Sequence, residues 1–377
     1  MKLRILFFLL LAACPLCAQR AATPNETARF LAGLPVRDTL LASLGGEPAW
    51  AEHATDFDRA WAELDARQLA KVRAWSAEFL GDAFTAKQPL FYFFSGPDIL
   101  YAQAFFPNAS TYVLAGLEPV GAIPNVQSLR ASALDSSLAT LRKSLNSVLS
   151  FSFFITKDMK TDLTQTQLSG TLPLLYVFLA RSGSRIETVE LVGLDKSGAF
   201  ASGKGTIAGV KITFFGPSGR LQTLYYFCTN LANDGIKSSP GFLKFCDGLG
   251  AGNSLVKAAS YLMHIGEFSG ARDFLLMHSR TLVQDDSGIP YRFFEPSRWA
   301  VRLFGHYPGP IDIFKQYAQP DLAAAYEASH PPALTFGFGY RWHPSQSSLI
   351  LASPRGAHTD SSTPPPDLVP TSTSMAQ

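Results

Sequence analysis

Three polar residues stand directly after two apolar segments of strand length, where side chains can bind a ligand or react. Ser95 and Asp98 follow the apolar run 90–94, and Glu118 follows the run 111–117. A helix-compatible stretch joins the two runs, so the pattern predicts a strand–helix–strand unit with buried strands. Because ligands bind outside the carboxyl ends of parallel strands, we expect the three residues at one edge of a sheet.

The same residues also have a structural interpretation, which the sequence leaves open. Ser95 or Asp98 can cap the helix that begins near Pro97, and Glu118 can be a turn residue before Pro119. In the functional interpretation, the amides at this helix N-terminus bind an anion instead.

A second group of polar and aromatic residues lies between residues 278 and 307. Asp285 and Asp286 end an apolar segment, and aromatic and basic residues follow at once. Aromatic faces beside fixed donors and acceptors are typical of pockets for small ligands or glycans. The alternative is a helix end, a glycine turn and an aromatic core cluster. The binding surface predicted here consists of Tyr291, Arg292, Arg302 and His306.

Two classes of function fit these groups. The first is a protein that binds a small molecule, a glycan or a protein partner. The second is a glycoside-type hydrolase, whose paired carboxyls would lie about 5–9 Å apart in one cleft at the strand ends. Binding is preferred because no G-x-S-x-G motif or other catalytic signature occurs. The carboxylates available to the hydrolase are Asp98, Glu118, Asp285 and Asp286.

The sequence predicts no cofactor, no metal site and no nucleic-acid partner. The stretch 198–205 approaches a phosphate-binding loop, but Gly205 stands where a hydroxyl is required and a strand follows. The seven histidines form no metal-binding motif. Lys2 and Arg4 account for the whole formal charge of +2, so the rest of the chain has no basic excess to attract nucleic acid.

The N-terminus has the layout of a secretory signal peptide. Two basic residues, a continuous apolar run and small residues follow in that order, so residues 1–18 are predicted to be removed. One alternative is cleavage after Ala18. The other is lipidation of Cys14 in a lipoprotein-like sequence, which would anchor the protein to a membrane. Both alternatives predict an exported bacterial protein, periplasmic or extracellular, and no later apolar run is long enough to span a membrane.

Two cysteines remain after the predicted signal peptide. Outside the cytosol, Cys228 and Cys246 can form a disulfide that closes a loop of about 18 residues and contributes up to ~3 kcal/mol. The equal alternative is two buried thiols, because the sequence does not show whether the Cα atoms approach within about 7 Å.

Local patterns predict the elements that position these residues. Apolar residues recur at three- and four-residue steps in two amphipathic helices, 57–80 and 128–150. Residues 209–228 are predicted to form a hairpin around a glycine–proline turn. The segment 239–330 is predicted to be mostly helical.

Together these elements predict an α/β or α+β fold, with a mixed sheet packed by amphipathic helices and a mostly helical C-terminal half. Residues 19–354 are predicted to form one globular domain, with a boundary near residue 235 as the alternative. Residues 355–377 lose their apolar content and are predicted to be a disordered tail.

Overall fold

The computed structural model of the chain describes residues 22–128, 131–151 and 168–356. The predicted signal peptide 1–18, with Cys14 and Ala18, lies outside the described residues, and so does the predicted tail from residue 357 onward. Within the described ranges, no helix is both long and apolar enough to cross a membrane.

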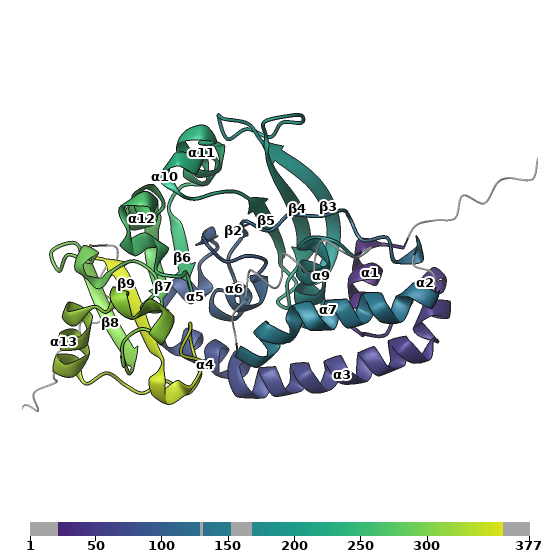
Figure 1. The fold of residues 1–377 in the computed structure, drawn as a ribbon, viewed down its shortest axis with the longest axis horizontal. Coiled ribbons are helices and arrows are strands. Elements are labelled where there is room, and N and C mark those ends of the chain that lie inside the picture. Colours follow the sequence, from purple (N-terminus) through teal and green to yellow (C-terminus); the bar gives the residue numbers. More distant parts are fainter. Residues whose placement is uncertain (1–21, 129–130, 152–167, 357–377) are drawn as a thin grey trace, which may run out of the picture.

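A mixed sheet of nine strands runs through the molecule (Figure 1), in the order β3-β4-β5-β2-β1-β6-β7-β9-β8. The five central strands β5, β2, β1, β6 and β7 are parallel. Antiparallel strands flank them on both sides. The strands are β1 (Leu90–Tyr92), β2 (Thr111–Gly116), β3 (Arg185–Leu194), β4 (Ile207–Phe215), β5 (Leu221–Cys228), β6 (Gly252–Val256), β7 (Ser279–Gln284), β8 (Trp299–Gly305) and β9 (Ser348–Pro354).

The parallel strands have the order of a doubly wound α/β sheet. Numbered in chain order, they read 3-2-1-4-5 across the sheet. β1 pairs with β2 on one side and with β6 on the other. Because β6 begins at Gly252, one sheet contains strands from before and after residue 235. The direction of winding therefore reverses between β1 and β6. In such sheets the connections diverge at this point and leave a crevice at the carboxyl edge.

The central strands are buried on both faces, which explains their continuous apolar sequences. Successive side chains of a strand point to opposite faces of the sheet. Tyr92 and Leu114 accordingly belong to one hydrophobic cluster, whereas Phe91 and Val113 belong to the other.

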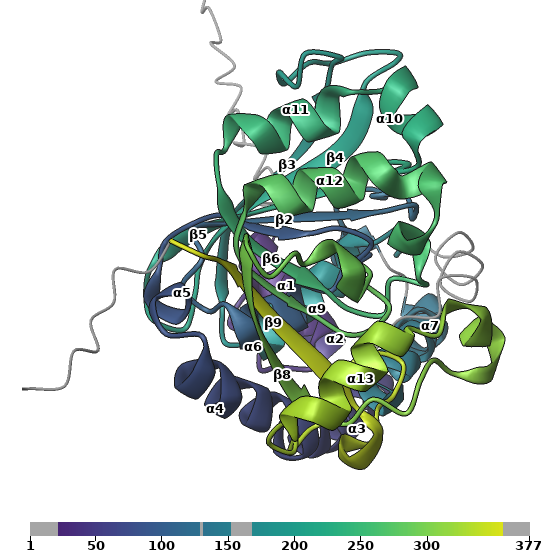
Figure 2. The same ribbon diagram turned by 90° about the vertical axis from the view of Figure 1, so that its left-hand side faces the viewer.

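Helices cover both faces of the sheet (Figures 1 and 2). α11 and α12 pack on one face, and α1, α3, α4, α6, α7 and α9 pack on the other. The helices are α1 (Pro24–Leu31), α2 (Thr39–Gly45), α3 (Pro48–Leu64), α4 (Ala70–Phe79), α5 (Asp82–Thr85), α6 (Ile99–Phe105), α7 (Ala131–Phe151), α9 (Leu172–Arg181), α10 (Asn233–Ser238), α11 (Gly241–Gly248), α12 (Ser269–His278) and α13 (Pro320–Ser329). A π-helical turn, Asp65–Leu69, joins α3 to α4, and 3-10 turns occupy Val126–Ser128, Leu262–His264, Gly266–Phe268, Tyr291–Phe293, Asp312–Tyr317 and Pro344–Gln346.

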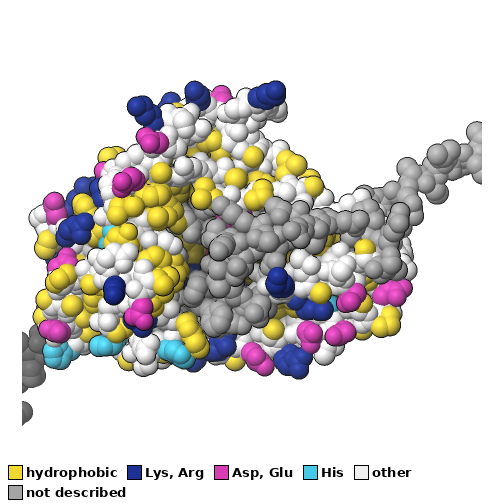
Figure 3. All heavy atoms as spheres, in the orientation of Figure 1, with side chains coloured by type: hydrophobic (Ala, Val, Ile, Leu, Met, Phe, Trp, Pro, Cys, Tyr) yellow, Lys and Arg dark blue, Asp and Glu magenta, His cyan; other side chains and the backbone are white. Residues whose placement is uncertain are grey.

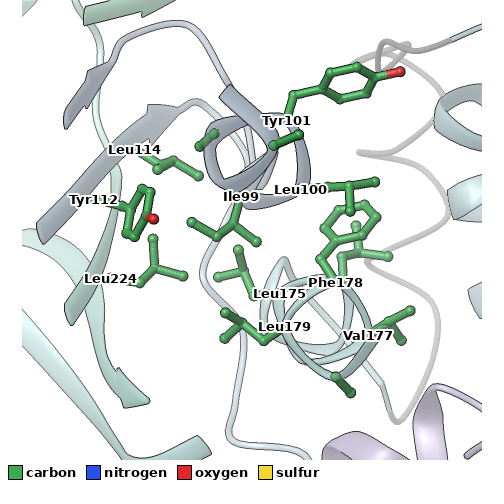
Figure 4. Close-up of a cluster of buried hydrophobic side chains, with 14 of the residues drawn as sticks. Ile99, Leu100, Tyr101, Tyr112, Leu114, Leu175, Val177, Phe178, Leu179 and Leu224 are labelled. Carbon is green, nitrogen blue, oxygen red and sulfur yellow. The ribbon is translucent and has the colours of Figure 1, made fainter. Parts of the chain in front are cut away.

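Helix α6 is held between the sheet and α9, and every one of its residues is buried. Figure 4 shows Ile99 facing Leu175 of α9, whereas the side chain of Tyr101 points away from these two residues. All three residues belong to one hydrophobic cluster. This complete burial fixes the turn before α6, which carries Asp98.

The structure confirms several predicted elements and the α/β or α+β class. β1, α6 and β2 form the strand–helix–strand unit, with β1 and β2 parallel. β4 and β5 form the predicted hairpin. The predicted helix 57–80 is the latter part of a longer helical segment that begins at Pro48.

The prediction of a mostly helical C-terminal half is not confirmed, because β6, β7, β8 and β9 all lie there. β6 and β7 have only five and six residues. An apolar run this short does not distinguish a buried strand from a buried helix by its periodicity.

Cys228 and Cys246 are not joined by a disulfide; both are thiols. Cys228 packs against the hydrophobic cluster on one face of the sheet, and its Sγ donates to the carbonyl oxygen of Leu117 at 3.6 Å. Cys246 is buried in the cluster on the other face. Of the two alternatives left open by the sequence, the structure has two thiols, but only Cys246 is buried and Cys228 is half-buried.

Candidate functional site

A cavity of about 610 Å³ lies at the carboxyl edge of the parallel strands, where the winding of the sheet reverses. The segments that follow four of these strands, β1, β2, β5 and β6, contribute to its lining. The remaining lining residues include Phe268, Ile311, Ile313, Phe314 and Tyr340.

The segment after β1 forms a tight turn under the cavity. Phe94 and Gly96 both have left-handed backbone conformations, with φ of 59° and 55°. The backbone amides of Ser95 and Gly96 donate to the carbonyl oxygen of Ala115 at the end of β2, at 3.0 and 3.3 Å. Ser95 lines the cavity, but its hydroxyl donates to the carbonyl oxygen of Gly96 at 2.8 Å. Its clearest role is therefore to hold the turn.

Asp98 has both the structural and the site position that the sequence left open, because it caps α6 and also lines the cavity. Its Oδ1 accepts the backbone N–H of Tyr101 at 3.1 Å, the geometry of an N-cap. Its Oδ2 accepts the hydroxyl of Tyr92 at 2.8 Å and lies 2.9 Å from Nζ of Lys257. Both carboxylate oxygens of Asp98 are thus occupied by protein donors.

Lys257 is a site residue that the sequence analysis missed. It directly follows β6, lines the cavity, and its side chain is only 2% exposed. Nζ lies 3.5 Å from the ring centroid of Tyr101. Burial lowers the pKa of Lys257, while the nearby Asp98 carboxylate acts in the opposite direction. The only sequence feature that could have indicated Lys257 as a site residue is a single basic residue directly after the apolar residues 255–256.

Glu118 lies at the end of β2, as predicted, and lines the cavity while remaining 2% exposed. The hydroxyl of Tyr226 donates to its backbone carbonyl at 2.8 Å and lies 3.3 Å from Oε2. Burial and this carboxylate raise the pKa of Tyr226. A Cβ on Gly116 would lie only 2.3 Å from Oε2 of Glu118, so glycine is what allows the carboxylate to fold back over the strand end.

Asp285 and Asp286 follow β7, but neither lines the cavity. Asp285 accepts the backbone N–H of Ala258 at 3.2 Å and the hydroxyl of Ser287 at 2.6 Å. Burial, with a contribution from Asp286, raises the pKa of Asp285 to about 7. Burial also raises the pKa of Asp286, which accepts a hydrogen bond from the hydroxyl of Tyr261.

These contacts hold a strained segment in the wall of the cavity. Ala258, Ser260 and Tyr261 have φ values of 51°, 53° and 56°, in the left-handed region that such residues rarely occupy. The hydroxyl of Tyr340 donates to the carbonyl oxygen of Ala258 at 3.0 Å and lies 2.8 Å from Oγ of Ser260. Strained backbone of this kind persists only where its surroundings hold it, and it clusters at functional sites.

The predicted surface of Tyr291, Arg292, Arg302 and His306 is separate from this cavity, since none of the four lines it. The guanidinium of Arg302 lies 5.3 Å from the ring centroids of Phe79 and Phe304, on the α4 side of the sheet. Arg292 lies over the ring of Phe293, and Tyr291 packs against the cluster around Leu303 and Tyr307. His306 is exposed, and its backbone N–H donates to the carbonyl oxygen of Ser347.

The lining of the cavity is apolar at the rim and carries slightly more acidic than basic side chains inside. Leu117 and Ile313 are 52% and 72% exposed while also lining the cavity. Hydrophobic side chains gather in the region of α12 and β6 on the face shown in Figure 3. The charged lining residues are Asp98, Glu118 and Lys257, so one negative charge is in excess. Among the described residues, no group of three or more His, Cys, Asp or Glu could hold a metal ion.

Comparison with protein-family models, with curated proteins and with solved structures finds no match to this chain. The site is therefore interpreted from its own geometry.

Proposed function

We propose that the protein binds a small molecule in this cavity, and that the ligand carries a vicinal diol beside an apolar ring and no phosphate. The main support for this proposal is the position of Glu118 in the cavity lining. In doubly wound sheets, an acidic side chain about 20 residues after the first turn accepts hydrogen bonds from ribose hydroxyls. Glu118 stands at the end of the second parallel strand and lines the cavity at the reversal point. Its carboxylate can accept hydrogen bonds from two adjacent hydroxyl groups.

The first turn argues against a pyrophosphate, which this type of sheet commonly binds at the helix N-terminus. Phosphate binding there requires glycines and unoccupied backbone amides. In this chain Pro97 has no N–H, and the Asp98 carboxylate accepts the amide of Tyr101. The excess negative charge of the lining also disfavours an anion. A neutral or cationic ligand fits these groups better.

The apolar rim supplies the surface for a ring. Leu117, Leu231 and Ile313 line the cavity from three separate segments, and Phe268 and Phe314 add aromatic faces. Ligand pockets combine such surfaces with a few fixed polar groups that set the orientation.

Titration calorimetry with matched ligands tests the proposal. Adenosine represents nucleosides, methyl glucoside represents glycans, and adenosine monophosphate tests the effect of a phosphate. 2′-Deoxyadenosine should bind about 10- to 150-fold more weakly than adenosine, because it lacks a hydrogen bond to a carboxylate worth about 1.5–3 kcal/mol. If methyl glucoside alone binds, the diol belongs to a glycan.

A variant pair locates the binding. Glu118→Gln should weaken the binding of every diol ligand, whereas Glu190→Gln on the exposed strand β3 should not. Equal affinities for adenosine and 2′-deoxyadenosine, or unchanged binding by Glu118→Gln, would refute the assignment of Glu118. Failure of every diol ligand to bind would refute the proposed function.

The hydrolase alternative receives less support from the site. Glu118 shares the cavity with neither Asp285 nor Asp286, so the predicted pairing of Glu118 with one of these two carboxyls in a single cleft does not occur. Release of nitrophenol from nitrophenyl glycosides, abolished by Glu118→Gln, would favour hydrolysis over binding.

We also propose export, on the basis of the N-terminal sequence pattern alone. Intact mass should show a chain that lacks residues 1–18, or one that begins at a lipidated Cys14. Purification of the full chain with Met1 from the cytoplasm would refute this proposal.

A further inference from the structure

Lys257 lies where a reactive amine could meet a ligand. It is the one lysine or arginine among the described residues that line the cavity. Its Nζ is 2.9 Å from Oδ2 of Asp98 and 3.5 Å from the ring centroid of Tyr101. The hydroxyl of Tyr92 donates to the same Oδ2, so a carboxylate oxygen lies directly beside the amine.

The position of this pair differs from that of a structural ion pair. A buried pair contributes little to stability unless its geometry is excellent, because both charges lose their hydration. This pair is almost fully buried and yet faces a cavity. Lysines that are desolvated by burial in a pocket are typical of amine nucleophiles.

We propose that Lys257 forms an imine with an aldehyde or ketone group of a molecule that enters the cavity. This inference uses the cavity of the proposed function, but it does not depend on the binding of a diol by Glu118. The chemical class it assigns is a small, uncharged carbonyl compound, since the acidic lining disfavours anions.

The reaction is balanced with the groups present. The Lys257 ammonium gives a proton to Asp98, and the lone pair on Nζ attacks the carbonyl carbon to form a C–N bond. The carbonyl π electrons move to oxygen, which takes a proton from nitrogen and gives a carbinolamine. Asp98 then returns its proton to this hydroxyl, the C–O bond breaks, and water leaves. The product is an iminium, whose positive charge again lies opposite the Asp98 carboxylate.

Desolvation also favours the reactive form of the amine. Burial lowers the pKa of Lys257 below the usual value for lysine. Each unit of lowering raises the deprotonated fraction at neutral pH about tenfold. The Asp98 carboxylate limits this effect but supplies the proton acceptor.

Reductive trapping in the folded wild-type protein tests the proposal. The protein is incubated at neutral pH with dihydroxyacetone and cyanoborohydride, and peptide mass mapping locates the reduced three-carbon adducts over time. Lys257 should be modified more than tenfold faster than the exposed Lys204 and Lys237. Modification of Lys257 no faster than these two lysines would overturn the proposal.

Variants separate this result from the proposed function. Lys257→Arg keeps a positive charge, so this variant should fold but should lose the rapid formation of an adduct in the peptide that contains residue 257. Rapid adduct formation in the variant would overturn the assignment to Lys257. Asp98→Asn should slow trapping at Lys257 by at least tenfold, because it removes the proton acceptor. Glu190→Gln, on the exposed strand β3 and outside the cavity lining, should be trapped at the wild-type rate. Trapping at Lys257 in wild-type protein that binds none of the diol ligands would refute the proposed function and leave this inference standing.

Discussion

Replacement of Lys257 by methionine tests whether the cavity floor holds a buried charge pair. Nζ of Lys257 lies 2.9 Å from Oδ2 of Asp98, and the two side chains are 2% and 3% exposed. Methionine keeps an unbranched apolar stem and removes the positive charge. Asp98 would then keep its hydrogen bonds from Tyr92 and Tyr101 but lose its ion-pair partner. We expect a loss of about 3–5 kcal/mol in the free energy of unfolding.

The assay is urea unfolding of Lys257→Met, Asp98→Asn and the double variant. The double variant removes both charges, so it should be more stable than the sum of the single losses predicts, with a coupling energy of about 2–3 kcal/mol. A surface pair provides the control. Arg73 and Asp65 are 2.8 Å apart but 47% and 49% exposed, so Arg73→Met should cost no more than about 1 kcal/mol.

Two results would refute this reasoning. One is a loss in Lys257→Met no larger than that in Arg73→Met. The other is additivity of the two single losses to within about 0.5 kcal/mol. Either result would mean that water reaches the pair, and the argument for a desolvated amine at Lys257 would lose its basis.

Three further predictions concern the groups around the cavity. Gly116→Ala should weaken diol binding in calorimetry at least as much as Glu118→Gln, because its Cβ would lie 2.3 Å from Oε2 of Glu118; wild-type affinity would contradict this packing. Gly339→Ala should lower stability in urea unfolding by about 1–3 kcal/mol more than Gly219→Ala. Both glycines have positive φ, but only at residue 339 would the Cβ meet Oδ2 of Asp285, at 1.8 Å; equal losses would contradict the clash. Because burial raises the pKa of Asp285 to about 7, the folded protein binds a proton there that the unfolded chain releases near pH 4. Stability should therefore fall as pH rises from about 4 to 7, and Asp285→Asn should flatten this slope relative to wild type; an unchanged slope would place the titration elsewhere.

Part of the site was predictable because its signal is local. Apolar runs at 90–94 and 111–117 with polar residues after them predict strand ends, and the sequence placed Asp98 and Glu118 there. The N-cap role of Asp98 was one of the predicted alternatives, and the structure shows it together with a place in the cavity lining. The predicted surface around Tyr291 and Arg302 depends on proximity in sequence, and the structure places these two residues in different environments.

The sequence by itself determined the strand–helix–strand unit, the hairpin and the strand-end position of Glu118, because periodicity, caps and turns act over a few residues. Only the tertiary structure decided which strands are neighbours. The pairing of β1 with β6 brings Lys257 to within 2.9 Å of Asp98, although 159 positions separate the two residues in the chain. Strand order follows from burial of the whole sheet between two helical layers, and no local pattern encodes it. The cavity and its lysine therefore belong to the fold and not to any motif.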